Sequence, residues 1–398
     1  MMRASSPRTV IILMAALQFV YLLDFLMLMP LVQDVALALH FDATKIGWLS
    51  AAYTASALVA GVLGVRWLER WPRRKVVLIA LVGLLLATLA ATRSESLHGL
   101  LWARVLTGLC GAPAIAAGMA LLLDVTPANQ RGKAIAQVMT GFALAVVLGV
   151  PLALQLATWL GDWRAPFYFL ASAMGILGLA MWRSLPASAV KLQNLPPARQ
   201  LWQQIPLRYA CLAQASAQFS AFLLVPQLAN FYLHNLGVPR PQLSWLYAAG
   251  GIAAFVTVQW LGRLADKRGE LLSASIASGV LLLGFVPFAA PSVMPVALFF
   301  ILFMAGNAGR NISLASAIGG IALPQQRAAV MALNSLVQDA AMSVAALLSS
   351  AVLLQDEQGR LQGMSVLAAV AILFSVVCAW ALWKLHSERR GEMCTQTL

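Results

Sequence analysis

Charged side chains are scarce in this chain. They make up 10% of its 398 residues, whereas hydrophobic residues make up 61%. A typical water-soluble domain has about 25% charged and about 45–50% apolar residues. Apolar runs of roughly 20 residues recur throughout, and a helix of that length crosses a bilayer. The composition therefore excludes a water-soluble globular domain and predicts an all-α membrane protein.

Cysteine and histidine are also rare, with four of each. The cysteines have no paired spacing and three lie inside apolar runs, so we expect packing residues rather than disulfides or metal ligands. The histidines form no cluster with metal-ligand spacing, and a phosphate-binding Gly-x-x-x-x-Gly-Lys-Ser/Thr loop is absent. We therefore expect no metal, no cofactor, no enzyme activity and no ATP-driven pump. Any uphill transport must draw on an ion gradient or on the substrate gradient.

The net charge of +13 is compatible with a nucleic-acid partner, but the placement of the bases argues against one. The bases fall in short segments between apolar runs, and no basic face with interleaved aromatic residues is present. Bases placed in this way indicate membrane topology. The sequence therefore predicts a surrounding lipid bilayer and no nucleic-acid partner.

Twelve membrane spans are expected from the apolar runs. They cover residues 10–38, 46–65, 76–92, 98–123, 134–160, 165–183, 207–233, 243–262, 271–290, 293–321, 329–354 and 363–384. The first run is too long for a signal peptide, so we expect an uncleaved helix. A segment with four prolines divides the spans into two sets of six. The predicted organisation is a six-helix bundle at 1–184, a cytoplasmic linker at 185–206 and a second bundle at 207–398.

The bases also predict the orientation of the chain. An even number of spans places both termini on the same side of the membrane. Twenty of the 27 lysines and arginines fall at the termini or in the segments on that side, and five fall on the other side. Because basic segments stay in the cytoplasm, both termini are expected there. The expected location is the cytoplasmic (inner) membrane.

The two halves of the chain carry a repeat. A short segment with an acid followed directly by bases occurs around Glu69 and again around Asp266, 197 positions later. Pro127 and Pro324, in a second pair of segments, are also 197 positions apart. Two independent segment pairs with one offset indicate a duplicated six-helix unit, and duplicated halves around a central site are typical of secondary transporters.

Three groups of residues resemble the major facilitator superfamily. Residues 262–269, Gly-Arg-Leu-Ala-Asp-Lys-Arg-Gly, are similar to the signature that its members carry after a second span, although the first copy departs from it with Glu69 and Pro72. Span 4 carries an Arg-x-x-x-Gly pattern that begins at Arg104. Span 5 carries a glycine and proline pattern like that of the antiporter branch, at Gly141, Gly149 and Pro151. The resemblance is greatest to the twelve-helix, proton-coupled drug and sugar efflux members.

The resemblance implies that the charged segments gate the transporter. In the family, the acid of the first signature faces the start of span 11, and neighbouring arginines pair with an acid after span 4. The alternative is that these charges are solvated and only set the topology. The gating residues predicted in this way are Gly61, Glu69, Arg70, Arg73, Asp124, Arg131, Gly262, Asp266 and Arg268.

Four charges lie inside the predicted spans, one acid and one base in each half. They are Asp24 and Arg104 in the first half, and Arg310 and Asp339 in the second. A charge at the bilayer centre costs at least about 2.5–3.5 kcal/mol, so it usually pairs, faces a cavity or has a function. Asp24 is the predicted proton carrier with Arg104 as its partner, and the alternative is a static pair. Asp339 is expected either to contact substrate or to pair with Arg310.

Uncharged polar and aromatic side chains recur at helical spacing near these charges. Amides are costly in lipid unless they are hydrogen-bonded, so we expect them to face the protein interior, where they contact either substrate or neighbouring helices. The candidate cavity residues are Gln18, Tyr21, Phe25, Gln214, Gln218, Asn307, Asn334 and Gln338.

The predicted function is proton-coupled efflux of small amphipathic compounds or drugs by alternating access. The expected partners are a small-molecule substrate and protons, and the chain is expected to be monomeric. Two alternatives remain: a proton symporter that imports a sugar or another metabolite, and a lipid or lysolipid translocator.

Overall fold

The computed structural model describes residues 7–67, 71–127, 130–186, 202–289, 295–321 and 327–396. Most of these residues are helical, and eleven helices in the described part of the chain are long and apolar enough to cross a membrane. The seventh predicted span is the exception, because α10 carries Arg208, Gln214 and Gln218 and stops at Phe222. The predicted all-α membrane class is confirmed.

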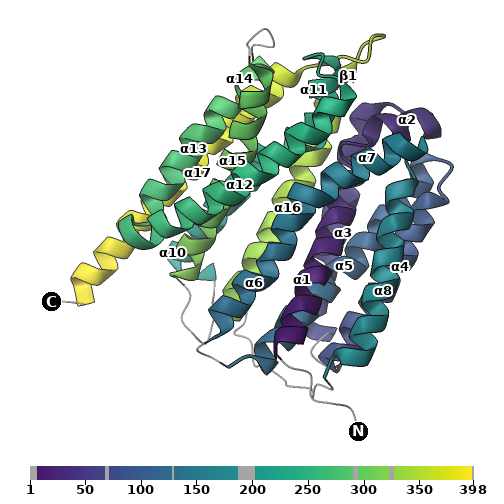
Figure 1. The fold of residues 1–398 in the computed structure, drawn as a ribbon. Helices are drawn as coiled ribbons and strands as arrows, with labels where there is room; N and C mark the ends of the chain where they lie inside the picture. The colour runs from purple at the N-terminus through teal and green to yellow at the C-terminus, as the bar shows by residue number, and fades with distance from the viewer. Residues whose placement is uncertain are drawn as a thin grey trace. The chain divides into compact units, whose positions relative to one another are not determined.

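The chain forms two compact units, residues 1–193 and 194–398. Their boundary falls within the predicted linker at 185–206, and residues 187–201 of that linker lie outside the described part of the chain. Figure 1 labels most of the elements of both units. The elements of unit 1 are α1 (Pro7–Leu26), α2 (Val32–Leu39), η1 (Ala43–Lys45), α3 (Ile46–Trp67), α4 (Arg73–Thr92), α5 (Leu97–Val125), α6 (Arg131–Leu144), η4 (Ala145–Gly149), α7 (Val150–Leu160) and α8 (Ala165–Ser184).

Unit 2 adds a short β-hairpin to its helices. The two strands pair antiparallel between the last two spans. The elements of unit 2 are α10 (Ile205–Phe222), η5 (Val225–Gln227), α11 (Leu228–His234), α12 (Arg240–Arg268), α13 (Glu270–Gly284), α14 (Val286–Ala289), α15 (Val296–Gly319), α16 (Arg327–Val352), β1 (Leu354–Gln355), β2 (Leu361–Gln362) and α17 (Met364–Gln396).

The two units repeat one packing plan. In unit 1, α1 packs on α5, α6 and α8, while α4 packs on α5 and α8, and α3 packs on α5. In unit 2, α10 packs on α15, α16 and α17, while α13 packs on α15 and α17, and α12 packs on α15. Each of these pairings has its counterpart in the other unit. The helix contacts thus match the duplication that the repeated segments indicate.

The first span of each unit is interrupted at the same position of the repeat. α1 ends at Leu26 and α10 ends at Phe222, which is 196 positions later. The helices resume as α2 and α11, whose first residues are also 196 positions apart. Pro30 and Pro226 lie in the two interruptions, and proline lacks the N–H that continues a helix. The sequence prediction of two continuous spans, 10–38 and 207–233, is therefore wrong.

Span 5 contains a π-helical turn. α6 passes into the π-helix η4, and α7 follows with Pro151 in its first turn. Because Pro151 removes one backbone donor, the regular hydrogen-bond pattern cannot continue there. The glycines of the same span allow close packing on α1: a Cβ at Gly141 would lie 2.0 Å from the carbonyl oxygen of Ala15, and one at Gly149 would lie 3.0 Å from Leu23.

The segment that resembles the family signature in the second half is helical. Residues 262–268 form the last two turns of α12, which ends at Gly269 with a φ of 95°. A positive φ favours glycine, so the turn begins there. The predicted end of this span at residue 262 is therefore wrong, because the helix continues through Asp266 to Arg268.

We predict that Gly141→Ala destabilises the protein, because its new methyl group would overlap the backbone of Ala15. Gly132→Ala is the matched control, since it lies in the same helix with open space around its Cβ position. Alanine there should be neutral or stabilising by up to about 1 kcal/mol. Thermal unfolding in detergent should show a lower midpoint for Gly141→Ala alone, and equal midpoints for the two variants would contradict the close approach.

Candidate functional site

A buried ion pair joins two helices of unit 1. The guanidinium Nη1 of Arg104 on α5 lies 3.1 Å from the Oδ2 atom of Asp24 on α1. The same nitrogen donates to the backbone carbonyl of Asp24 at 3.0 Å. Both side chains are almost fully buried, and the guanidinium lies over the ring of Phe167 at 5.6 Å. The structure therefore brings together the acid and base that the sequence predicted in the first half.

The helix ends and close packing explain why these groups meet. Asp24 is in the last turn of α1, where backbone carbonyls lack intrahelical donors and a cation is favoured. Arg104 supplies both a donor and a cation. Gly108, one turn later on α5, brings this helix close to α3, because a Cβ there would lie 2.2 Å from the carbonyl oxygen of Tyr53. The Arg-x-x-x-Gly pattern thus combines a charged side chain with a small residue that lets α5 pack closely on α3.

A third helix completes the environment of the carboxylate. The hydroxyl of Thr88 on α4 lies 3.0 Å from the Oδ1 atom of Asp24 and 2.9 Å from the carbonyl oxygen of Leu84. The sulfur of Met174 on α8 lies 3.9 Å from the same hydroxyl. Thr88 was not among the residues predicted from sequence. It lies on a different helix from Asp24, so no helical spacing between the two residues indicates their contact.

Aromatic side chains lie beside this pair. The ring centroids of Phe25 and Tyr53 are 4.7 Å apart, and those of Tyr21 and Tyr53 are 6.1 Å apart. Gln18, one turn before Tyr21, is buried in α1. Three predicted cavity residues therefore gather on the helix that carries Asp24, with an additional tyrosine from α3.

Unit 2 has a buried arginine without a carboxylate at the corresponding place. Arg310 on α15 donates to the carbonyl oxygen of Ala217 at 2.6 Å and to the hydroxyl of Ser375 at 3.2 Å. Ser375 also bonds to Ser220, which lies 196 positions after Asp24. A serine thus occupies the repeat position of the acid. The expected alternative of an Arg310–Asp339 ion pair is not formed among the described residues, and the guanidinium donates to the Ala217 carbonyl and the Ser375 hydroxyl instead.

The other predicted cavity residues of unit 2 lie on three helices. Gln218 on α10 donates to Asn311 on α15 at 3.3 Å, and Gln214 is buried one turn before it. The amide oxygens of Asn307 and Asn334 are buried and have no hydrogen-bond partner among the described residues. Gln338 and Asp339 on α16 are half-buried. The roles of these residues in a substrate cavity stay predictions.

The charged segments at the helix ends form one predicted contact. Arg73, the first residue of α4, pairs with Asp124 near the end of α5 and donates to the carbonyl oxygen of Ala120 at 2.9 Å. Arg131 lies at the start of α6, where its Nε donates to Thr126 at 3.4 Å. Gly61 lies within α3. The gating roles of these residues stay predictions.

Other predicted gating residues lie elsewhere or are undescribed. Glu69 and Arg70 lie outside the described residues. Asp266 and Arg268 are exposed and form no ion pair with a residue that the structure describes. Unit 2 has instead an ion pair between Glu270, the first residue of α13, and Arg389 on α17. Glu270 lies 197 positions after Arg73, and this shared register is the signal that sequence reasoning missed.

The hairpin of unit 2 is attached to the end of the seventh span. The amide of Asn235 exchanges two hydrogen bonds with the backbone of Leu361, each 2.9 Å long. His234 lies next to Gly359, whose Cβ position is 3.0 Å from the imidazole Nδ1. Burial lowers the pKa of His234, and the Asp356 carboxylate opposes that shift. The contact ties α11 to the segment between α16 and α17.

Comparison with solved structures defines the class of the fold. The chain aligns over 95% of its length with a bacterial homologue of the human lysosomal transporter Spinster, covering 96% of that chain with a TM-score of 0.74 and 15% identity. It aligns equally far with a nucleoside transporter, covering 99% of that chain with a TM-score of 0.71 and 15% identity. The fold is that of a membrane transporter with two six-helix bundles.

The family follows from the sequence. The model of the Major Facilitator Superfamily matches residues 14–209 and 210–392, and the chain belongs to this family. It is 29% identical over 289 residues to a chloramphenicol resistance protein of Streptomyces lividans, which covers 70% of this chain and 72% of that one. It is 24% identical over 273 residues to a chloramphenicol efflux pump of Mycobacterium tuberculosis, and the match covers 67% of this chain and 65% of that one. The protein is a multi-pass membrane transporter of small molecules, not an enzyme.

We predict that Asp24 and Arg104 are strongly coupled in stability. Removing one member of a buried pair leaves an uncompensated group and typically costs about 3–5 kcal/mol. Asp24→Asn, Arg104→Gln and the double variant should therefore form a non-additive cycle, in which the double variant loses less than the sum of the single losses. Unfolding midpoints in detergent measure this, and additive losses would show that the pair contributes no mutual stabilisation.

Proposed function

We propose that this protein is a proton-coupled exporter of small amphipathic compounds, in which Asp24 carries the proton. The observation that supports this proposal best is the buried carboxylate of Asp24, held by Arg104 and Thr88. Intramembrane acids are costly and mark proton pathways in transporters. In unit 2, the repeat position of Asp24 is Ser220, so the acid is not needed to build a six-helix unit.

The surroundings of Asp24 suit both of its protonation states. A threonine hydroxyl has one hydrogen to donate and lone pairs that accept. Thr88 can donate to the carboxylate when Asp24 is charged. When Asp24 is protonated, the acid can donate to Thr88, whose own hydrogen then serves the carbonyl of Leu84 at 2.9 Å. Protonation of Asp24 therefore leaves the Thr88 hydroxyl and the Leu84 carbonyl hydrogen-bonded.

Protonation would also change what holds α1 to α5. The charged carboxylate needs the guanidinium, because an unpaired buried anion is strongly disfavoured. A protonated Asp24 does not, and Arg104 then retains only the backbone carbonyl and the face of Phe167. The α1 end at Leu26 directly precedes the interruption before α2. Proton occupancy would thus bias the position of the outer part of span 1, which is a population shift between conformations.

The substrate class is inferred from the side chains and from the named relatives. Tyr21, Phe25 and Tyr53 offer aromatic surface, and the unsatisfied amide oxygens of Asn307 and Asn334 offer acceptors. Sites with mostly apolar walls and few polar groups suit small amphipathic molecules. The chloramphenicol resistance and efflux proteins among the relatives make chloramphenicol the first compound to test.

The proposed orientation places both termini in the cytoplasm of a bacterial inner membrane. It rests on the distribution of bases, twenty on one side and five on the other. In this orientation the interruptions of α1/α2 and α10/α11 lie toward the outer side. We propose that the transporter acts as a monomer.

We predict that Asp24→Asn loses proton-driven transport. Asparagine keeps the shape of the side chain but cannot exchange a proton. Acidifying the lumen of inverted membrane vesicles should drive accumulation of labelled chloramphenicol by the native protein, and Asp24→Asn should reduce this accumulation at least tenfold. Exchange of substrate down its own gradient should persist in the variant.

Asp34→Asn is the matched control, because it removes an acid from the outer helix of the same span. It should transport like the native protein. Unchanged pH-driven accumulation by Asp24→Asn would overturn the coupling role. Accumulation that requires an acidic exterior of inverted vesicles would instead indicate import, and failure to move any small compound while lipids are transferred would indicate a translocator.

A further inference from the structure

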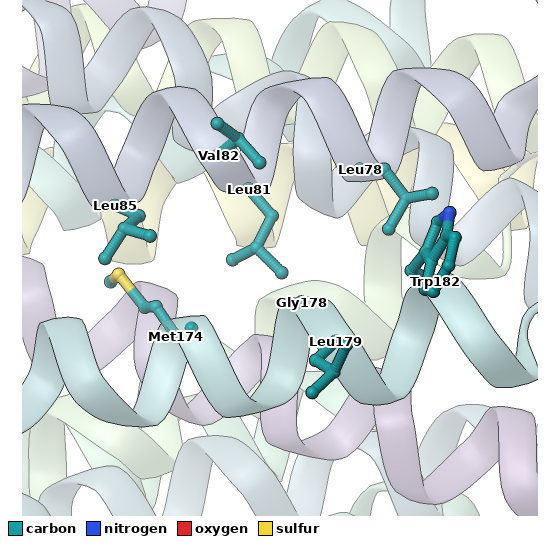
Figure 2. Close-up of a pocket in the computed structure, with 9 residues that line it drawn as sticks. Leu78, Leu81, Val82, Leu85, Met174, Gly178, Leu179 and Trp182 are labelled. Atoms are coloured by element: carbon teal, nitrogen blue, oxygen red, sulfur yellow. The ribbon is translucent and has the colours of Figure 1, made fainter.

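An apolar groove runs between α4 and α8 on the surface of unit 1. Its volume is about 310 Å³. Figure 2 shows Leu78 opposite Trp182 at one end of the groove and Leu85 opposite Met174 at the other. The remaining lining residues are Leu81, Val82, Gly175, Gly178 and Leu179.

Glycines keep this groove open. A Cβ at Gly175 would have nothing within 4 Å, and one at Gly178 would meet only Leu81 at 3.7 Å. Small residues normally let helices approach each other in lipid. Here the space above them is unfilled, so the two glycines provide volume rather than close packing.

Basic residues surround one end of the groove. The guanidinium of Arg74 donates to the backbone carbonyl of Trp182. Lys75 and Arg183 are exposed at the same two helix ends. Among the described residues at these helix ends, the acid Asp124 is paired with Arg73. The mouth of the groove therefore has a net positive charge beside an exposed indole, which is typical of a membrane interface.

The dimensions suit one leaflet of a bilayer. Leu78 and Leu85 are seven residues apart, which is about 10 Å along a helix. Half of a hydrocarbon core is about 15 Å thick. A groove that starts at the basic helix ends thus reaches most of the way to the midplane, as an acyl chain would.

We propose that this groove binds one acyl chain of an anionic phospholipid, whose phosphate group contacts Lys75 and Arg183. Basic residues beside transmembrane helices commonly bind anionic headgroups. In the proposed orientation, this lipid belongs to the cytoplasmic leaflet. At its inner end the chain contacts Met174, whose sulfur lies against the Thr88 hydroxyl that binds Asp24.

Native mass spectrometry of the purified full chain tests the proposal, with phosphatidylglycerol and phosphatidylcholine offered in equal amounts. The native protein should retain phosphatidylglycerol preferentially. Gly175→Leu fills the groove without a backbone clash and should weaken phosphatidylglycerol binding about tenfold. Gly279→Leu is the matched control, because it adds the same side chain in open space on α13 of unit 2 and should bind like the native protein.

A second set of variants tests the contribution of the basic residues separately from that of the apolar groove. The double variant Lys75→Gln, Arg183→Gln should lose the preference for phosphatidylglycerol over phosphatidylcholine, whereas Lys133→Gln, which removes an exposed base at another helix end, should keep it. Equal phosphatidylglycerol binding by the native protein and Gly175→Leu would overturn the proposal. The proposal would also be overturned if Gly175→Leu weakened the binding of chloramphenicol and left lipid binding unchanged.

Discussion

The bond between Arg104 and Asp24 is the interaction on which the rest of unit 1 depends. A guanidinium cannot lose its charge inside a membrane protein, so it needs an acceptor wherever the fold buries it. The end of α1 offers two, a carboxylate and a free backbone carbonyl. Thr88 donates to the same carboxylate, and Gly108 lets α5 lie close to α3 one turn after Arg104. Both bonds to the end of α1 are made by Nη1, while Nε and Nη2 of Arg104 are buried without a hydrogen-bond partner among the described residues.

The two units show what duplication preserves and what it changes. Helix pairings and the interrupted first spans are shared, because both depend on backbone packing and on prolines at one offset. The chemistry differs, because unit 1 buries Arg104 against an acid, whereas unit 2 buries Arg310, which is not at the repeat position of Arg104, against a carbonyl and a serine. One architecture therefore carries a buried carboxylate, Asp24, in unit 1 and a buried serine, Ser220, at the repeat position in unit 2.

Much of the fold was predictable because a membrane imposes simple rules on sequence. Apolar runs must reach about 20 residues and bases must stay outside the hydrocarbon, so span positions and class could be read directly. The partnership of Asp24 with Arg104 was predictable as well, since two buried charges in one half have few alternatives. The same reasoning was less reliable for Asp339 and Arg310. Serines and backbone carbonyls, which carry no charge signal, satisfied Arg310 instead.

The sequence alone determined the all-α membrane class, the duplicated halves and the family, because these follow from hydropathy, repeated segments and motifs along the chain. The tertiary structure alone decided which groups meet. Thr88 reaches Asp24 from 64 positions away, and Gly141 faces Ala15 across 126 positions. The positions of the helix breaks and of the π-turn were also decided by the tertiary structure. Prolines permit such interruptions, but neighbouring helices decide where the freed backbone groups find partners.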